Sequence, residues 1–274
     1  MLSVFGRKPT LARPRSQLCT AAQFREPDYA HWGKEYGFDP AVLHRKRWEF
    51  VYISRVAEYL DLLRPCARAL AFGVGREPLV SAFAARGVSV VATDAPADDA
   101  NWSLTNEYAE GLKSVWREEA IPWDRFTSLV EFRRVDMNDI PADLRAFDFL
   151  WSSCALEHLG TLKHGADFIL NAMECLKPGG VAIHTTEFNV SSNRRTCESG
   201  LVCLFRKRDI KALARTLTRM GHEVLPINFY AGNELPDKHI DLPPFGEPHL
   251  KLQLTLELET YVTTSIGIAI KKKS

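Results

Sequence analysis

The chain has 274 residues, of which 46% are hydrophobic and 25% are charged, and its formal net charge is +1. This length and apolar content predict one α/β domain with an added cap rather than two independent domains. The near balance of charge argues against a nucleic-acid partner, which would require a basic face. The six cysteines form no C-x-x-C pair and lack clustered histidines, so neither a disulfide framework nor a metal site is predicted.

Residues 1–63 are predicted to form an N-terminal segment with a cap helix over the site. Its first residues are basic but lack an apolar signal-peptide core, and no stretch of the chain suits a membrane span, so a cytoplasmic location is expected. Apolar residues at helical spacing predict an amphipathic helix over residues 40–63. Before it, His31 and Trp32 lie in an aromatic, polar stretch and are predicted to contact substrate as part of a lid or wall. Core packing of Trp32 is the alternative.

Residues 68–94 predict a strand, a glycine turn, a helix and a second strand. Gly73 and Gly75 follow an apolar run, and glycine lets a backbone turn sharply and approach a ligand closely. Pro78 suits the first turn of a helix, and it occupies the third-glycine position of a dinucleotide-binding G-x-G-x-x-G turn. Asp94 ends the second strand, where an acid hydrogen-bonds ribose in doubly wound sheets. The pattern indicates a cofactor with ribose and no pyrophosphate, with a plain tight turn as the alternative.

Three further strands are predicted over residues 130–135, 147–153 and 181–187, with polar residues at their ends. The carboxyl ends of parallel strands share one edge of a sheet, and ligands bind at that edge near the switch in strand order. A long insertion at about residues 97–128 precedes these strands and is expected to hold a helix over about residues 105–119.

The C-terminal part predicts a helix over residues 209–220 and then two strands, over residues 222–229 and about 261–270. A loop at about residues 231–258 separates the two strands. The predicted fold class is α/β, a doubly wound, mostly parallel seven-stranded sheet with helices on both faces and a C-terminal antiparallel strand pair.

In order and spacing these motifs resemble the class I S-adenosylmethionine-dependent methyltransferases. The matching pieces are Phe72-Gly-Val-Gly75, Asp94, Asp136-Met137, the strand and loop over residues 147–159, and Leu176-Lys-Pro-Gly-Gly180. The resemblance implies a Rossmann-like methyltransferase domain over residues 64–274, with S-adenosyl-L-methionine as cofactor and S-adenosyl-L-homocysteine as product. The cofactor-binding residues that it implies are Phe72, Gly73, Gly75, Glu77, Asp94, Trp102, Asp136, Met137 and Ser153.

Two positions depart from the pattern of the resembling enzymes. Those enzymes usually have an acid just before the first glycine, where this chain has Phe72. A third glycine is often present where this chain has Glu77. Both departures bear on contacts to the methionine end of the cofactor.

Methyl transfer from a sulfonium requires alignment of a nucleophile and, for a hydroxyl or a protonated amine, a base. His158 follows the fourth strand in the loop that faces the transferring methyl in the resembling enzymes, and it is predicted to be that base. A ring that only hydrogen-bonds a backbone carbonyl is the alternative for His158. Glu187, at the end of the fifth strand, is a second catalytic candidate.

The sequence gives fewer indications of the methyl acceptor than of the cofactor. Glu157 and Asn189 are predicted to contact substrate, and the polar run at residues 187–193 suits a hydroxyl-rich acceptor, such as a sugar or polysaccharide end, for O-methylation. N-methylation and methylation of a natural product have the same signature. A non-catalytic cofactor-binding module and an NAD-dependent oxidoreductase are the alternatives from other classes. The expected partner is a small-molecule or glycan acceptor.

Overall fold

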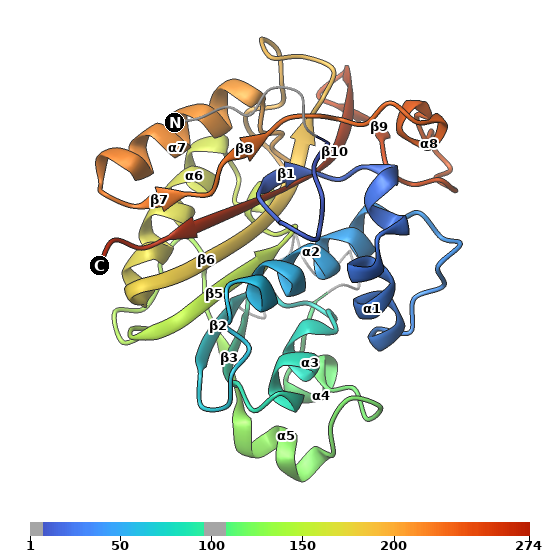
Figure 1. The fold of residues 1–274 in the computed structure, drawn as a ribbon. Coiled ribbons are helices and arrows are strands. Elements are labelled where there is room, and N and C mark those ends of the chain that lie inside the picture. Colours follow the sequence, from blue (N-terminus) through green and yellow to red (C-terminus); the bar gives the residue numbers. More distant parts are fainter. Residues whose placement is uncertain (1–7, 96–107) are drawn as a thin grey trace.

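The computed structural model describes residues 8–95 and 108–274, which form one mixed sheet with helices on both faces (Figure 1). The sheet has ten strands in the described residues, in the order β4-β3-β2-β5-β6-β10-β1-β8, with β7 and β9 also paired to β10. The predicted fold class is confirmed. The strand count exceeds the predicted seven because short strands add to the antiparallel side of the sheet.

The parallel half of the sheet contains the predicted strands. These are β2 (Arg68–Phe72), β3 (Ser89–Asp94), β4 (Val130–Arg134), β5 (Phe147–Ser153) and β6 (Leu176–Asn189). From β2 the chain proceeds outward through β3 to β4 and then returns to place β5 on the other side of β2. The strand order therefore switches between β2 and β5, which places a crevice beyond their carboxyl ends.

The antiparallel half of the sheet is built around β10 (Glu259–Lys271), which pairs with β6 over most of its length. The short strands around it are β1 (Ser16–Leu18), β7 (Glu223–Val224), β8 (Ile227–Asn228) and β9 (Leu252–Leu256). The strand predicted over residues 222–229 is divided into β7 and β8 around Pro226, because proline has no N–H for a ladder hydrogen bond. The N-terminal segment contributes β1 to the sheet.

Helices cover both faces of the sheet. One face carries α1 (Pro27–Glu35), α2 (Arg45–Tyr59), α3 (Leu79–Ala85) and α5 (Trp123–Leu129), and the other carries α6 (Leu162–Ala172) and α7 (Lys207–Arg219). Short helices are η1 (Ala21–Arg25), α4 (Leu112–Val115), η2 (Leu156–His158), η3 (Met173–Cys175) and α8 (Leu235–Lys238). Along the strands alternate residues face opposite layers, so Ala71 packs toward α2 and Phe72 toward α6.

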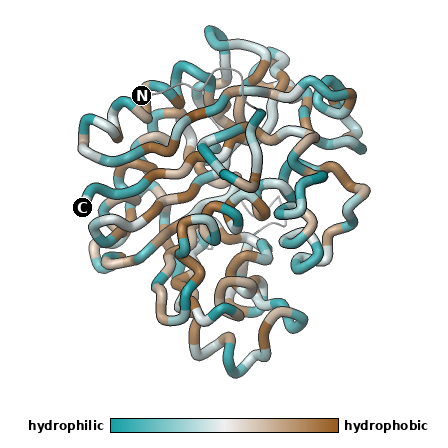
Figure 2. The backbone as a smooth tube through the Cα atoms, viewed as in Figure 1, coloured by the Kyte–Doolittle hydropathy of each residue, from teal (hydrophilic) through white to brown (hydrophobic). Residues whose placement is uncertain are grey.

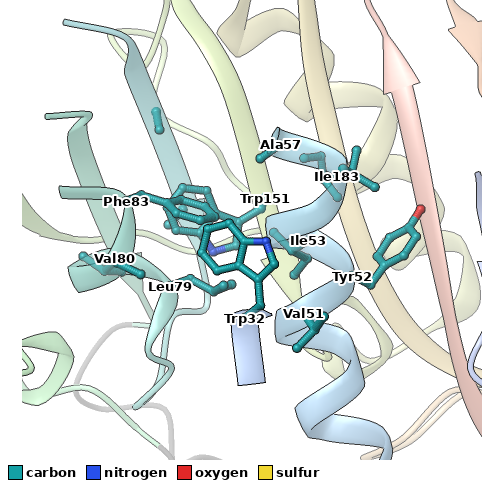
Figure 3. Close-up of a cluster of buried hydrophobic side chains, with 14 of the residues drawn as sticks. Trp32, Val51, Tyr52, Ile53, Ala57, Leu79, Val80, Phe83, Trp151 and Ile183 are labelled. Atoms are coloured by element: carbon teal, nitrogen blue, oxygen red, sulfur yellow. The ribbon is translucent and has the colours of Figure 1, made fainter. Parts of the chain in front are cut away.

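Each layer is closed by apolar side chains, and the tube coloured by hydropathy shows hydrophobic residues along the inner strands (Figure 2). On the α2 face, Trp32, Phe83 and Trp151 lie together beside Ile53 and Ile183 (Figure 3). Trp32 is 0% exposed. It is therefore part of the core, which corrects its prediction as a wall of the substrate site.

The insertion between β3 and β4 departs from its prediction. Its described part begins at residue 108 and holds only a short helix, α4, followed by α5 after Pro122. The long helix predicted over residues 105–119 is thus interrupted, because the chain is fully extended at Gly111 and Trp116 already has extended backbone angles. Among the described residues, no helix combines the length and apolarity needed to span a membrane.

Candidate active site

A cavity of about 460 Å³ lies at the carboxyl ends of β2, β3 and β5, beside the switch in strand order. Predicted cofactor or catalytic residues that line it are Gly73, Gly75, Glu77, Asp94, Asp136, Met137, Ser153 and His158. Ligand sites of roughly 300–1,000 Å³ are usual for small molecules and cofactors. The fold therefore brings together side chains that are up to 85 positions apart in the sequence, from Gly73 to His158.

The turn after β2 depends on its glycines. Gly73 and Gly75 both have positive φ, +60° and +49°, in the region that favours glycine. A Cβ on Gly73 would lie 2.8 Å from Cβ of Ala155 and 3.5 Å from Sδ of Met137. The backbone of this turn consequently lies directly against the loop after β5 and the residues after β4.

Asp94 ties the glycine turn to the tip of β3. Its carboxylate accepts hydrogen bonds from the backbone N–H groups of Gly75 (3.1 Å), Ala95 (2.8 Å) and Ala109 (2.9 Å). Burial raises the pKa of Asp94, and these N–H donors oppose that rise. Asp94 is thus a fixed acceptor at the rim of the cavity, at the position where ribose is bound in doubly wound sheets.

Glu77 is a buried carboxyl in the cavity wall. It is 4% exposed, and its Oε1 accepts a hydrogen bond of 2.6 Å from the indole Nε1 of Trp151. Burial raises the pKa of Glu77 well above its ordinary value, an effect that nearby Asp94 reinforces and that the indole donor opposes. The site therefore holds an acid where a glycine was expected.

The residues after β4 form the next part of the cavity wall. Asp136 is exposed and accepts a hydrogen bond of 2.8 Å from the backbone N–H of Asn138, whereas Met137 is buried. Met137 presents its thioether near the Gly73 turn. Their position fits the adenine-facing pair that the resemblance implies, and Trp102, also assigned to the cofactor, lies outside the described residues.

His158 lies at the rim of the cavity, in η2. Its Nδ1 is 2.8 Å from the carbonyl oxygen of Leu201. A carbonyl can only accept, so in the neutral ring Nδ1 carries the proton and Nε2 is the basic nitrogen. The carbonyl contact foreseen as the alternative is thus present, and it also orients the ring as a base requires.

Glu187 and Glu157 belong to a buried polar network next to the cavity. Glu187 forms an ion pair with Arg45, which also bonds Glu49 at 3.1 Å. Glu157 is 0% exposed and accepts hydrogen bonds from Cys154 Sγ (2.8 Å) and Thr186 Oγ1 (2.9 Å). Neither acid lines the cavity. Both carboxylates have protein partners beside the site, and their predicted direct roles stay predictions.

The polar run after β6 satisfies its own backbone. Asn189 Oδ1 accepts from the N–H groups of Ser191 (2.9 Å) and Ser192 (3.0 Å), and its Nδ2 donates to the carbonyl of Arg195 at 3.1 Å. Ser192 Oγ in turn accepts from the N–H of Arg195 at 2.9 Å. The predicted substrate contact of Asn189 is corrected, because its hydrogen-bonding groups hold this loop in place.

Three other predicted residues also lie away from the cavity. His31 is exposed on α1, and the buried Trp32 donates its indole N–H to Oε2 of the exposed Glu58 at 3.0 Å. The Phe72 ring packs edge-on against Phe168 under the opposite face of the sheet, at 5.1 Å between centroids. Of Phe72, only the backbone adjoins the glycine turn.

Several cavity residues were not predicted from the sequence. Lys46 and Phe50 reach the cavity from α2, Cys154 from the end of β5, and Tyr108 from the insertion. For Cys154, the signal was its place directly after the fourth strand. No sequence pattern singles out Lys46 and Phe50, because their approach depends on how α2 packs across the sheet edge.

A glycine turn, an acid at the tip of the next strand and a cavity at the switch point define a nucleoside-binding α/β domain of the Rossmann-like class. Residues 70–184 match the sequence model of a family described as a methyltransferase domain. Residues 70–184 therefore carry a methyltransferase domain, in a fold of the Rossmann-like class that S-adenosylmethionine-dependent methyltransferases share. No curated protein sequence matches the chain significantly.

Several solved structures are similar to the chain at low sequence identity. One is a magnesium protoporphyrin IX methyltransferase from Synechocystis with bound S-adenosylmethionine, at 11% identity over 91% of this chain and 93% of that chain, with a TM-score of 0.48. Another is a 1,6-didemethyltoxoflavin-N1-methyltransferase from Burkholderia thailandensis, at 17% identity over 89% and 84%, with a TM-score of 0.46.

A third similar structure is assigned as a sarcosine dimethylglycine methyltransferase from Galdieria sulphuraria. It is 18% identical over 66% of this chain, with a TM-score of 0.45. The present chain spans 60% of the length of that protein.

Proposed function

We propose that the cavity binds S-adenosyl-L-methionine and that its methyl group passes to a small-molecule acceptor beside Ser153, Cys154 and His158. The observation that carries the proposal is the direct hydrogen bond between the Gly75 turn and Asp94 at the sheet's switch point. The volume of the cavity and the absence of a side chain on Gly73 suit a nucleoside pressed against backbone.

Different residues would bind the cofactor, align the acceptor and remove its proton. When bound, the cofactor supplies a sulfonium methyl that is already activated toward nucleophiles. Asp94 would accept a hydrogen bond from a ribose hydroxyl, and Asp136 and Met137 would face the adenine. Ser153, Cys154 and Ala155 form the wall where the acceptor must be aligned, and alignment alone lowers a barrier by several kcal/mol. His158 would take the acceptor proton through Nε2, a contribution of roughly 10²- to 10⁴-fold.

The N-terminal segment supports this arrangement as a cap. Through Lys46 and Phe50, α2 reaches the cavity, which supports the proposal of a cap over residues 1–63. Strand β1 also pairs with β10 and β8, which anchors the segment to the sheet. We propose the domain division at residue 64 on this basis.

The acceptor class is proposed as a small molecule with a hydroxyl or an amine. A sugar acceptor remains one form of this proposal, although the polar run that suggested it is engaged in its own hydrogen bonds. An amine is equally compatible with a histidine base. A screen of sugars and amines, with the methylated atom assigned by NMR, separates O-methylation from N-methylation.

Calorimetric titration with S-adenosylhomocysteine tests the cofactor half without an acceptor. Saturable one-site binding that is weakened in Asp94→Asn is expected. Binding of NADH in place of S-adenosylhomocysteine would establish the oxidoreductase alternative. Failure of both ligands to bind a folded protein would indicate a non-catalytic module.

His158 is tested with His164 as its matched control. His164 Nδ1 also lies 2.9 Å from a backbone carbonyl, that of Leu159, but this ring is exposed and does not line the cavity. His158→Gln should lower kcat by roughly 10²-fold or more while S-adenosylhomocysteine binding stays intact, and His164→Gln should change neither. Equal rates for the two variants would remove His158 as the base.

A further inference from the structure

The carboxyl of Glu77 has an unusual environment for an acid. It is 4% exposed, and across residues 8–95 and 108–274 the side chain that hydrogen-bonds it is Trp151, through Oε1. The ion pairs of this part of the chain do not include Glu77. Buried carboxyls in proteins are normally paired with a cation or with several donors. Glu77 has one donor, and it lines the ligand cavity.

The nearby charged and titratable groups do not supply that cation. The charge of Arg117 lowers the pKa of Glu77, but its guanidinium donates to the carbonyls of Ser114 (3.0 Å) and Trp116 (2.9 Å). Lys46 and Arg76 also line the cavity, and neither forms an ion pair with Glu77 in the described residues. On the other sides of Glu77 lie Asp94 at the tip of β3 and Tyr36 after α1, and neither carries positive charge. The wall around Glu77 is therefore arranged for a positive group that comes from the cavity.

The sequence offers a reason for an acid at this position. In the resembling enzymes an acid precedes the first glycine, near the methionine end of the cofactor. In this chain the preceding residues are Ala71 and Phe72, and both are 0% exposed. Glu77 lies just beyond the second glycine, on the opposite side of the same turn. The Glu77 carboxyl thus lies at the other end of the glycine loop from the acid of the resembling enzymes.

We propose that Glu77 binds the α-ammonium group of the methionine moiety of the methyl donor and of the homocysteine product. This inference rests on the proposed function of the cavity. An ammonium has three N–H donors and one positive charge, so it satisfies the carboxylate oxygen that Trp151 leaves open. Charge-assisted hydrogen bonds of this kind are about twice as strong as neutral ones. Trp151 acts as the positioning residue that fixes the carboxyl.

The test compares two ligands that share the adenosine and the sulfur and differ in the amino-acid part, which carries the proposed contact. S-adenosylhomocysteine carries the ammonium, whereas 5′-methylthioadenosine keeps the adenosine and sulfur and lacks the amino-acid part. Glu77→Gln preserves the size of the side chain and its acceptor for Trp151. It should weaken S-adenosylhomocysteine roughly 30-fold or more and leave 5′-methylthioadenosine within about twofold. Asp94→Asn, the control for the shared ribose, should weaken both ligands.

The outcomes separate this inference from the proposed function. If the wild type binds both ligands and Glu77→Gln binds S-adenosylhomocysteine equally well, the inference is overturned and the function stands. Equal weakening of both ligands by Glu77→Gln would show that Glu77 shapes the pocket, which also overturns it. If the wild type binds neither ligand, the proposed function itself fails.

A proton count gives a second readout. Burial raises the pKa of the Glu77 carboxyl in the ligand-free protein, and a bound ammonium favours the ionised form. At pH 6, where the ligand amine is protonated, binding of S-adenosylhomocysteine should therefore release protons from the wild type. Calorimetry in two buffers of different ionisation enthalpy measures that release. An identical proton balance in Glu77→Gln would contradict the assignment.

Discussion

The backbone N–H of Gly75 donates a hydrogen bond to Oδ2 of Asp94 across 3.1 Å. This contact joins the glycine turn after β2 to the tip of β3, and the Thr93 hydroxyl reinforces it by donating to the carbonyl of Ala71 at 2.8 Å. The two parts of the sequence that indicated a nucleoside site are therefore held together before any ligand binds. A site organised in advance loses less conformational entropy on binding.

Asp94→Ala should lower the stability of the ligand-free protein as well as its affinity for cofactor. The substitution leaves the N–H groups of Gly75, Ala95 and Ala109 without their acceptor, at a cost of about 1–3 kcal/mol. Urea unfolding measures this change. Asp139→Ala, at an exposed carboxyl, is the control and should lie within about 0.5 kcal/mol of the wild type. Unchanged stability of Asp94→Ala would mean that water replaces the carboxylate without loss.

Gly73→Ala should abolish or strongly weaken cofactor binding. Its Cβ would lie 2.8 Å from Cβ of Ala155, so the turn or the loop after β5 must move. Gly179→Ala is a matched control, because its φ of +75° imposes similar backbone strain while no atom lies within 4 Å of the added Cβ. Both variants should lose roughly 1 kcal/mol or more of stability. Only Gly73→Ala should lose S-adenosylhomocysteine binding, and equal affinities in titration would refute the steric argument.

Arg45→Met should be strongly destabilising. Arg45 is 5% exposed and pairs with Glu187 and Glu49, so its removal leaves two buried carboxylates without their cation, at a cost of about 3–5 kcal/mol. Adding Glu187→Gln to Arg45→Met should recover part of the loss, which a double-mutant cycle in urea detects. Lys163→Met, which breaks an exposed pair with Asp167, should cost at most about 1 kcal/mol. Losses of similar size in the two single variants would argue against a buried charge network.

The buried imidazole of His184 should make the protein sensitive to acid. Burial lowers the pKa of His184 to about 3, and its Nδ1 lies 2.8 Å from Ser152 Oγ. An unfolded chain takes up a proton below its ordinary pKa near 6.5, whereas the folded ring stays neutral. Stability that is present above pH 6.5 is therefore lost as pH falls toward 3, by about 1.4 kcal/mol per pH unit for this residue.

The measurement is urea unfolding between pH 7 and pH 5 for the wild type and His184→Gln. The variant should show a shallower fall in stability with acid, although a slope remains because burial also lowers the pKa of His44 to about 3. His164→Gln, at an exposed histidine, should keep the full slope. A wild-type slope in His184→Gln would show that the ring takes up its proton in the folded state.

The parallel half of the sheet follows closely from the sequence. The strands predicted at residues 130–135 and 147–153 appear as β4 and β5. For β5, which is buried between two helical layers, the signal is a short apolar run between turns. Elements at the antiparallel side were less predictable. Strand β1 has only three residues and is stabilised by pairing with β10, a contact that no local pattern encodes.

The candidate site also has residues that the sequence predicts and residues whose roles it does not predict. Gly73, Gly75 and Asp94 can be predicted from the sequence. A turn with positive φ favours glycine, and an acid at the end of the second strand is typical of a ribose site. The partners of Glu187 and Asn189 could not be predicted from the sequence, because a polar side chain at a strand end can bind either a ligand or another group of the protein. Arg45, from a distant helix, decides the matter for Glu187.

By itself the sequence determined the class of the protein, because the order of strand, glycine turn, helix, strand and acid reflects backbone geometry and binding chemistry that act over a few residues. Only the tertiary structure decided which polar groups face the cavity. That choice depends on how α2 and the loops after β5 and β6 pack across the sheet edge, which gives Glu157, Glu187 and Asn189 partners within the protein. The same packing leaves Glu77 in the cavity wall, where, among the residues that the structure describes, Trp151 is the side chain that donates to its carboxyl.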